Sequence, residues 1–192
     1  MGRGLLIILS GPSGVGKGTV RREIMKDESL NLVYSISMTT RSPRNMEADG
    51  VDYYFVSQEE FQKRIDQDDF LEWCEFVGNR YGTPRSIVEK LRDEGKNVFL
   101  EIETNGANQV MSKIQDNNVV SIFLVPPSLK SLEERIRKRK SETDKVILER
   151  LNKGRREMEL KDNYDYVVVN DRVDKAAKEI VKIIKSKMKL NK

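Results

Sequence analysis

Short apolar runs alternate with amphipathic stretches along this chain. Five runs rich in β-branched residues are typical of strands buried on both faces; they cover residues 5–9, 33–36, 98–101, 119–125 and 166–169. The stretches between them have helical periodicity and cover residues 17–27, 104–114, 128–139, 144–161 and 173–189. Strands that alternate with helices predict an α/β fold, a parallel sheet with helices on both faces. Ligands of such sheets bind beyond the carboxyl ends of the strands.

Residues 37–92 interrupt this alternation. They contain more turns and aromatic residues, and Ser57 and Glu60 have the spacing of a capping box at the start of a helix over 57–66. We expect a small mixed subdomain laid over the sheet. A second excursion, around residues 139–144, joins two highly charged helices and predicts a mobile flap. The expected division is a core of residues 1–36, 93–134 and 156–192, an insertion of 37–92 and a lid of 135–155.

A glycine-rich loop follows the first apolar run directly. It reads Gly11, Pro12, Ser13, Gly14, Val15, Gly16, Lys17, Gly18, Thr19. A strand, a glycine-rich turn and a helix start are the context of a phosphate-binding loop, in which backbone N–H groups and a lysine surround an anion. The alternative is an ordinary glycine-rich turn, which the strand before the loop and Lys17 within it disfavour.

This loop departs from the usual pattern at one position. Gly18 stands where a serine or threonine normally helps to hold Mg²⁺, and Thr19 follows it. Either Thr19 reaches the metal shell, or Mg²⁺ is held mostly by phosphates and water.

The amino-acid composition limits which groups the chain can use for catalysis and binding. The 192 residues include no histidine, so the commonest general base and zinc ligand are absent, and catalysis has to use Lys, Arg, carboxylates or a metal. The single cysteine, Cys74, excludes an internal disulfide and favours a reducing cytoplasm, and no apolar run is long enough to span a membrane.

A net charge of +4 fits a nucleic-acid surface or a site for several phosphates. We expect no nucleic-acid partner, because the basic residues are interleaved with acidic ones and the densest basic run, 135–140, lacks aromatic residues.

Two segments of the insertion have residues suited to a nucleotide. Arg41 and Arg44 lie in a turn after a predicted strand and could clamp a phosphate. Tyr53, Tyr54 and Tyr81 could add hydroxyl donors, and a solvated basic turn is the alternative. In the second segment, a buried Glu72 could accept hydrogen bonds from guanine N1–H and its 2-amino group, which adenine lacks. Hydroxyls of Ser37 and Thr83 could donate to guanine O6, whereas Trp73 and Cys74 fit packing roles.

Charged residues also follow later strands and helices. Glu101 and Glu103 come at a strand end, share one side at period two, and occupy the place where many P-loop proteins hold Mg²⁺ or its waters. One of these two carboxylates could instead be at this position simply because the strand ends there and meets solvent. Basic residues cluster beside the flap and could close over phosphates from a lid: they are Arg135, Arg137, Lys138, Arg139, Lys140 and Arg150.

Across almost its full length the chain resembles the guanylate kinases, which are ATP:GMP phosphotransferases. The matching segments are 11–19, Ser37-Met-Thr-Thr-Arg-Ser-Pro-Arg44, 50–55, Phe70-Leu-Glu-Trp73, Tyr81-Gly-Thr83, Leu100-Glu-Ile-Glu103, 139–143 and 166–171. The resemblance implies a P-loop nucleoside monophosphate kinase fold with a five-stranded parallel sheet, an inserted GMP-binding subdomain and a helical lid. It implies transfer of a phosphoryl group from ATP, bound with Mg²⁺, to GMP, and we expect dGMP to be accepted as well.

The resemblance also assigns residues. For GMP they are Ser37, Arg41, Arg44, Tyr53, Glu72, Tyr81, Gly82, Thr83 and Glu101. For ATP they are the loop 11–19 and Asn170, which is implied to lie near the base, with Thr19 as a metal candidate. For catalysis they are Lys17, Arg44, Arg135, Arg139 and Arg150. Two residues depart from the family pattern: Lys140 where a small residue is usual in the lid, and Glu101 where some members have Asp.

Two other functions stay open at this point. One is a different nucleoside monophosphate kinase, for adenylate or thymidylate, which the Gly18-Thr19 ending of the loop would suit. Glu72 together with Ser37 and Thr83 favours guanine instead. The other is a non-catalytic guanylate-kinase-like scaffold domain, which the intact Gly16-Lys17 pair and the stand-alone length of the chain disfavour. The oligomeric state is not predicted.

Overall fold

Five parallel strands form the centre of the computed structural model, which describes residues 2–114, 116–138 and 143–190. Their order across the sheet is β2-β7-β1-β8-β9. They are β1 (Leu6–Ser10), β2 (Leu32–Tyr34), β7 (Asn97–Glu101), β8 (Val119–Val125) and β9 (Tyr166–Val169). Each lies within two residues of a predicted strand, and the predicted α/β fold with a parallel sheet is confirmed.

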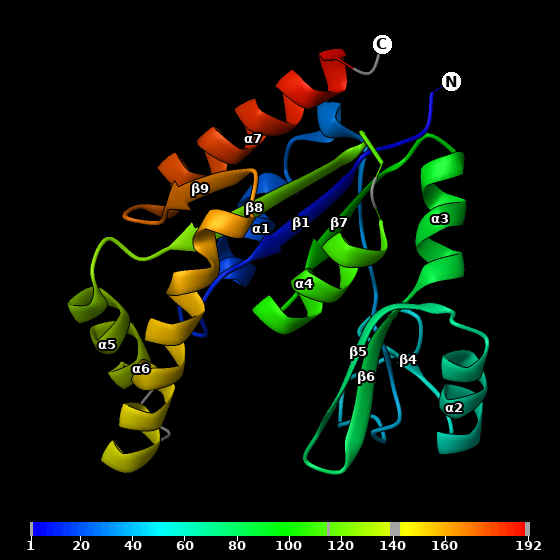
Figure 1. Cartoon of the computed structure of the whole chain (residues 1–192), viewed down its shortest axis with the longest axis horizontal. Helices are drawn as coiled ribbons and strands as arrows, with labels where there is room; N and C mark the ends of the chain where they lie inside the picture. Colours follow the sequence, from blue (N-terminus) through cyan, green and yellow to red (C-terminus); the bar gives the residue numbers. More distant parts are fainter. Residues whose placement is uncertain (1, 115, 139–142, 191–192) are drawn as a thin grey trace.

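Helices cover both faces of this sheet, and every residue of β1 is buried between them (Figure 1). Ile7 and Leu9 point into a core shared with α1 (Lys17–Ile24) and α7 (Val173–Leu190). Leu6 and Ile8 point to the opposite face, into a core shared with α3 (Arg85–Asp93) and α4 (Thr104–Lys113). Helix α3 was not predicted from the sequence.

A second, mixed sheet lies apart from the first, in the order β4-β3-β6-β5 (Figure 1). Its strands are β3 (Met38–Thr39), β4 (Tyr54–Phe55), β5 (Phe70–Phe76) and β6 (Asn79–Pro84). Met38, Phe61 and Phe70 form a small core beneath α2 (Gln58–Asp66). Ser57 caps this helix, because its hydroxyl accepts the N–H of Glu60.

Two helices stand on the other side of the molecule from the second sheet (Figure 1). They are α5 (Leu129–Arg137) and α6 (Asp144–Met158), and they pack through Leu132, Ile136, Ile147 and Leu151. The remaining short helices are η1 (Glu28–Leu30) and η2 (Glu159–Asn163). The last of these replaces the end of the helix predicted to run to residue 161. Arg139 and Lys140 lie outside the described residues.

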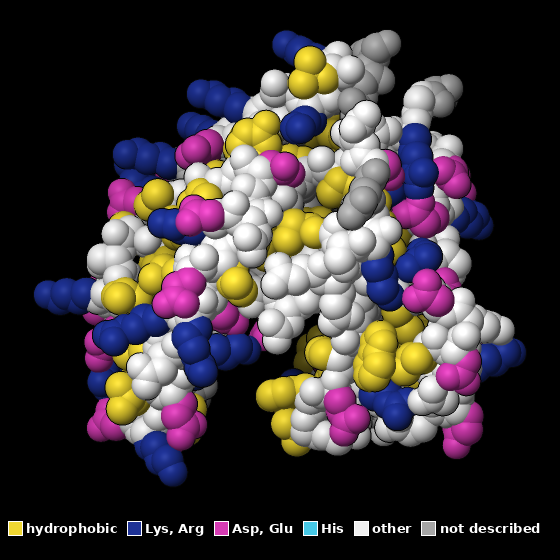
Figure 2. Space-filling model, in the orientation of Figure 1, with side chains coloured by type: hydrophobic (Ala, Val, Ile, Leu, Met, Phe, Trp, Pro, Cys, Tyr) yellow, Lys and Arg dark blue, Asp and Glu magenta, His cyan; other side chains and the backbone are white. Residues whose placement is uncertain are grey.

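Figure 2 shows a hollow between the α5–α6 pair and the second sheet, with Lys and Arg side chains gathered over the helix pair. No helix of the described chain is both long enough and apolar enough to cross a membrane.

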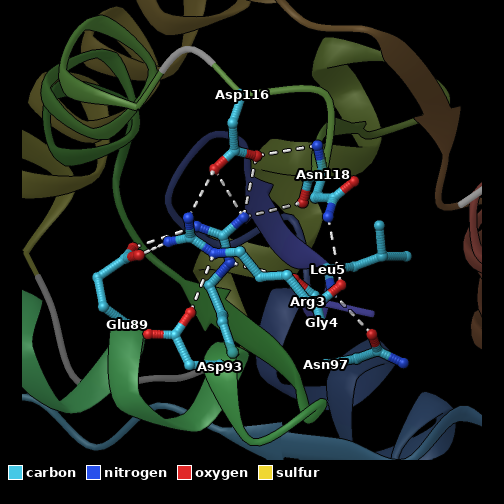
Figure 3. A network of polar contacts seen from close by, with 9 residues as sticks. Arg3, Gly4, Leu5, Glu89, Asp93, Asn97, Asp116 and Asn118 are labelled. Carbon is cyan, nitrogen blue, oxygen red and sulfur yellow. Dashed lines mark hydrogen bonds and ion pairs between the residues drawn. The ribbon is translucent and has the colours of Figure 1, made fainter. Parts of the chain in front are cut away.

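A fully buried arginine fixes the end of α3 to the first sheet (Figure 3). Arg92 donates to both carboxylate oxygens of Asp116, at 2.9 and 3.0 Å, to Glu89 at 3.1 Å and to the carbonyl of Gly4 at 3.2 Å. Arg3, which is partly exposed, reaches the same carboxylates of Glu89 and Asp116. The network therefore ties the end of α3 to the segments that precede β1 and β8.

Replacing Arg92 with methionine is expected to lower the free energy of unfolding by about 3–5 kcal/mol, because the change leaves buried acceptors and carboxylates without their cation. Urea unfolding measures the loss. Arg3→Met is the matched control, and it should cost at most about 1 kcal/mol because Arg3 is 40% exposed. Equal losses for the two variants would contradict this assignment of the network's stability to Arg92.

Candidate active site

The glycine-rich loop joins β1 to α1 at the carboxyl edge of the first sheet. Gly11 and Gly16 have φ angles of 144° and 101°, which only glycine adopts readily. Neither position has room for a side chain: a Cβ on Gly11 would lie 2.3 Å from the carbonyl oxygen of Leu124, and one on Gly16 would lie 2.8 Å from Nδ2 of Asn170. The loop is thus held tightly, and Gly16 is the N-cap residue before α1, whose free N–H groups are suited to an anion.

Lys17 lies across the mouth of this loop. Its Nζ donates to the carbonyl of Gly11 at 2.6 Å and to that of Pro12 at 3.4 Å. Burial lowers the pKa of Lys17, and the carboxylates of Glu101 and Glu103 partly oppose that effect. The ammonium is therefore poorly hydrated where it lies, so an anion beside it would gain a strong electrostatic interaction.

Two arginines of the helix pair contact the loop. Arg135 donates to the carbonyl of Val15 at 3.0 Å and to that of Asn170 at 2.7 Å. Arg150 donates to the hydroxyl of Ser13 at 2.7 Å. The structure thus brings both α5 and α6 to the loop; Arg139, predicted to act with them, is not among the described residues.

Asn170 closes the other side of the loop. It follows β9, and its Nδ2 donates to the carbonyl of Val15 at 2.8 Å. Its Oδ1 is buried, and no described residue donates a hydrogen bond to it. An unpaired buried acceptor beside the loop is suited to an amino or N–H donor of a ligand.

Strand pairing builds a carboxylate pocket in the second sheet. Glu72 on β5 pairs with Thr83 on β6, next to a register shift after Phe70. The Glu72 side chain is buried, its Oε1 accepts the hydroxyl of Thr83 at 2.6 Å, and a Cβ on Gly106 would lie 2.8 Å from its Oε2. Burial raises the pKa of Glu72, and the hydrogen bond from Thr83 only partly offsets this.

An amide side chain that the sequence did not reveal fastens this pocket to the first sheet. Gln109 of α4 accepts the N–H of Trp73 and donates to its carbonyl, both at 3.2 Å. Trp73 packs on the small core of the second sheet as predicted. Cys74 is exposed, so the packing role predicted for it is wrong.

The remaining residues predicted to bind GMP lie on the second sheet or beside it. Ser37 precedes β3, and Gly82 of β6 pairs with Met38. The guanidinium of Arg41 lies 5.5 Å from the ring centre of Tyr53, whose ring is 6.1 Å from that of Tyr81.

A further carboxylate orients the arginines of this group. Glu47 accepts Nη2 of Arg41 at 2.9 Å and the backbone N–H of Arg44 at 2.7 Å. The side chain of Arg44 is exposed. The sequence reading missed Glu47, although its spacing of three from Arg44 suits a turn.

The two carboxylates predicted to share one side have different surroundings. Glu101 ends β7, where its Oε2 accepts Nε of Arg21 at 2.8 Å. Glu103 precedes α4, is exposed, and accepts Nζ of Lys153 of α6 at 3.0 Å. Glu101 lies at the loop, because a Cβ on Gly18 would be 3.3 Å from its Oε1. Both carboxylates raise the pKa of Lys17, and Glu103 adds to the rise in the pKa of Glu72 that burial causes.

The sequence reading also missed Arg21 as a partner of Glu101. The signal for it was its position one helical turn after Lys17, which places both on one face of α1. Thr19, the predicted metal residue, is exposed, and its hydroxyl accepts a hydrogen bond from Arg22 at 3.3 Å.

Comparison with known proteins identifies the family of this chain. The family model of guanylate kinase matches residues 3–187. A guanylate kinase of Mesoplasma florum is 53% identical over 182 residues, which are 95% of this chain and 61% of that protein. A guanylate kinase of Bacillus cereus is 54% identical over 182 residues, 95% of this chain and 88% of that protein.

A solved structure extends the agreement to three dimensions. The crystal structure of guanylate kinase from Anaplasma phagocytophilum matches with a TM-score of 0.73 at 34% identity, over 96% of this chain and 86% of that one. Sequence and structure together show that the chain belongs to the guanylate kinase family.

Proposed function

We propose that this chain transfers the γ-phosphoryl group of ATP to GMP, giving ADP and GDP, and that it also accepts dGMP. The observation that carries the proposal is the buried Glu72 carboxylate, which accepts the hydroxyl of Thr83 on the second sheet of a chain whose first sheet bears a glycine-rich loop with Lys17. The product is a purine nucleoside diphosphate, so the reaction would belong to purine nucleotide metabolism. The single cysteine, exposed and free, supports a cytoplasmic location.

The proposed donor site is the loop with the helix pair above it. Residues 11–19 would bind the phosphates of ATP, and Lys17 would meet the outer ones. Arg135 and Arg150 would neutralise the transferring group, together with Arg139, while the unpaired Oδ1 of Asn170 would face the base. In the same proposal residues 135–155 act as the lid, 37–92 as the acceptor subdomain and the rest as the core.

The proposed acceptor site is on the second sheet. Glu72 would accept guanine N1–H and the 2-amino group, and the hydroxyl of Ser37 would donate to O6. Thr83 donates its one hydroxyl hydrogen to Glu72 in the structure, so it would have to turn from Glu72 to donate to O6 as well. Adenine offers no such pair of donors and would leave a buried carboxylate unpaired. Arg41, Arg44, Tyr53, Tyr81 and Gly82 would surround the GMP phosphate, with Glu101 between the phosphates of the two nucleotides. None of these residues is assigned to the ribose 2′-hydroxyl, which is why dGMP should be accepted.

The chemistry needs no general base. The attacking atom is a phosphate oxygen, largely ionised at neutral pH because the second pKa of a phosphate monoester is about 6. The residues have to align two anions and neutralise their charge, which Lys17 and the arginines supply. Mg²⁺ bound with ATP would neutralise further charge on the phosphates, and a carboxylate oxygen of Glu101 beside Gly18 is a donor of the type it prefers.

A coupled assay of ADP release tests the proposal, with Mg²⁺·ATP and, separately, GMP, dGMP, AMP, UMP or dTMP. Turnover with GMP and dGMP alone is the expected result. Turnover with another monophosphate would overturn the assignment of guanine as the base of the acceptor, although the protein would still be a nucleotide kinase. A folded protein that binds GMP in a thermal-shift assay and turns over nothing would favour the scaffold function.

A further inference from the structure

A helix of the first sheet covers the free edge of the second. Strand β5 comes last in the order β4-β3-β6-β5, and no other strand of the described chain pairs with its outer edge. In place of a strand, Gln109 of α4 accepts the N–H of Trp73 and donates to its carbonyl, both at 3.2 Å. Lys113, one turn later, donates to the carbonyl of Phe70 at 2.8 Å. Gln109 thus bonds both backbone groups of one residue, as a residue of a neighbouring antiparallel strand does.

The same face of α4 borders the carboxylate of the pocket. Gly106, Gln109 and Lys113 are spaced by three and four residues, so they lie on one face of the helix. A Cβ on Gly106 would lie 2.8 Å from Oε2 of Glu72. The other oxygen, Oε1, accepts the hydroxyl of Thr83 on β6 at 2.6 Å. The carboxylate thus contacts both β6 and α4, and its direction depends on how β5 is held between them.

The path of β5 next to Glu72 is irregular. The register with β6 shifts between Phe70 and Glu72, so the strand bulges at Leu71. Leu71 packs in the core of the first sheet, whereas Phe70 packs in the small core of the second. Because a bulge interrupts the ladder of backbone hydrogen bonds, pairing with β6 holds Glu72 less firmly than it would in a regular strand. Gln109 bonds the residue directly after Glu72 and fixes the bulged segment from the outer edge.

We propose that Gln109 is a positioning residue for guanine recognition. By holding both backbone groups of Trp73, it sets the direction in which Glu72 presents its carboxylate to N1–H and the 2-amino group. Both polar atoms of the Gln109 amide bond Trp73, so the residue acts through the strand and not on the base. Direction matters because a hydrogen bond weakens steeply as its angle departs from linear. The inference rests on the proposed function, in which Glu72 accepts guanine, and adds a residue that governs selection for the 2-amino group.

Discrimination between GMP and IMP measures this role. Gln109→Met keeps the length of the side chain but makes neither bond to Trp73. It is expected to lower kcat/KM for GMP about 10-fold or more, because misplacing a group by about 1 Å can cost about 10²-fold. The loss should be smaller for IMP, which lacks the 2-amino group, so the GMP-to-IMP ratio falls. The loss should lie mainly in KM, because the base is bound alike in the ground state and the transition state.

A second variant and a control accompany this one. Gln109→Asn keeps the amide but is one methylene shorter, so it should lower the ratio as Gln109→Met does. Gln62→Met is the matched control: it also replaces a helical glutamine of the described chain, but that amide bonds Asp66 and Arg80 at the surface. Its ratio should equal that of the wild type. Urea unfolding, followed by the fluorescence of the single tryptophan, Trp73, shows that each variant is folded.

A double variant separates positioning from a general loosening of the pocket. In Glu72→Gln the carboxylate that Gln109 positions is gone. Adding Gln109→Met should therefore not lower the GMP-to-IMP ratio any further, because two residues that act through one interaction are not additive. A residue that merely stabilises the second sheet would lower turnover of both substrates by the same factor in either background.

Two results would overturn the inference. The folded variants Gln109→Met and Gln109→Asn could keep the wild-type GMP-to-IMP ratio, or Gln109→Met could lower the ratio further in the Glu72→Gln background. Both leave the proposed kinase standing, because the wild type still turns over GMP and prefers it to IMP. If the wild type turns over no GMP, or shows no preference for it over IMP, the proposed function or the proposed role of Glu72 fails first.

Discussion

Lys17→Ala should lower turnover of GMP by at least about 10²–10³-fold, the usual cost of losing one charge-stabilising contact in a transition state. Lys17 contacts the backbone of the loop directly, because its Nζ is 2.6 Å from the carbonyl of Gly11. Phosphoryl transfer places growing charge on oxygens that the loop and this ammonium would surround. GMP affinity should be unchanged, because the acceptor pocket is built by the second sheet. Coupled ADP release and calorimetric titration of GMP measure the two quantities.

The fold should survive this substitution. Burial lowers the pKa of Lys17, so the charged form is less favourable in the folded chain than in the unfolded one at neutral pH. Removing the side chain relieves that cost, and the unfolding temperature should stay level or rise slightly. Lys26→Ala, which removes an exposed cation near the same helix, should leave turnover unchanged. If the folded Lys17→Ala protein turned over GMP at the wild-type rate, the proposed mechanism would be contradicted.

The sequence predicted best those parts of the molecule that are determined by residues adjacent in the chain. The central strands β1, β7 and β8 are largely apolar on both faces, so their burial can be predicted from consecutive residues. The prediction of burial on both faces is wrong for the edge strand β9, where Val167 and Val169 are 41% and 48% exposed. The loop is likewise a local motif, because its glycines, its lysine and the preceding strand are contiguous. Glu72 was identified because its segment is largely apolar and a carboxylate within it needs a partner.

What the sequence did not reveal depends on contacts between distant segments. A buried Arg92 cannot be told from a solvated one until Asp116 and the carbonyl of Gly4 are placed beside it. Arg21 and Gln109 looked like ordinary surface residues of helices, yet one fixes Glu101 and the other fixes Trp73. The exposure of Cys74 has the same origin, because β5 leaves the core of the second sheet partway along its length.

Glu72→Gln is expected to lower kcat/KM for GMP by about 10²–10³-fold. Two hydrogen bonds from guanine to a charged acceptor contribute about 1.5–3 kcal/mol each, and the glutamine amide would turn a donor toward a donor. The loss should be smaller for IMP, which has the N1–H but lacks the 2-amino group. Glu75→Gln on the exposed part of β5 is the matched control and should change neither substrate. Equal losses for GMP and IMP would contradict the assignment of the 2-amino group to Glu72.

The ratio of kcat/KM for GMP to that for IMP should also depend on pH. Because burial raises the pKa of Glu72, its carboxyl takes up a proton at a higher pH than an ordinary glutamate does. The protonated form has lost the charge that both guanine donors require, so preference for GMP over IMP is present above the raised pKa and is lost as pH falls through it. Ionisation of the substrate phosphate affects GMP and IMP alike and cancels in the ratio of their kcat/KM values. In Glu72→Gln the ratio should be low at every pH, because an amide does not titrate. A wild-type ratio that stays constant down to the ordinary range of carboxyl groups would show that a group other than Glu72 reads the 2-amino position.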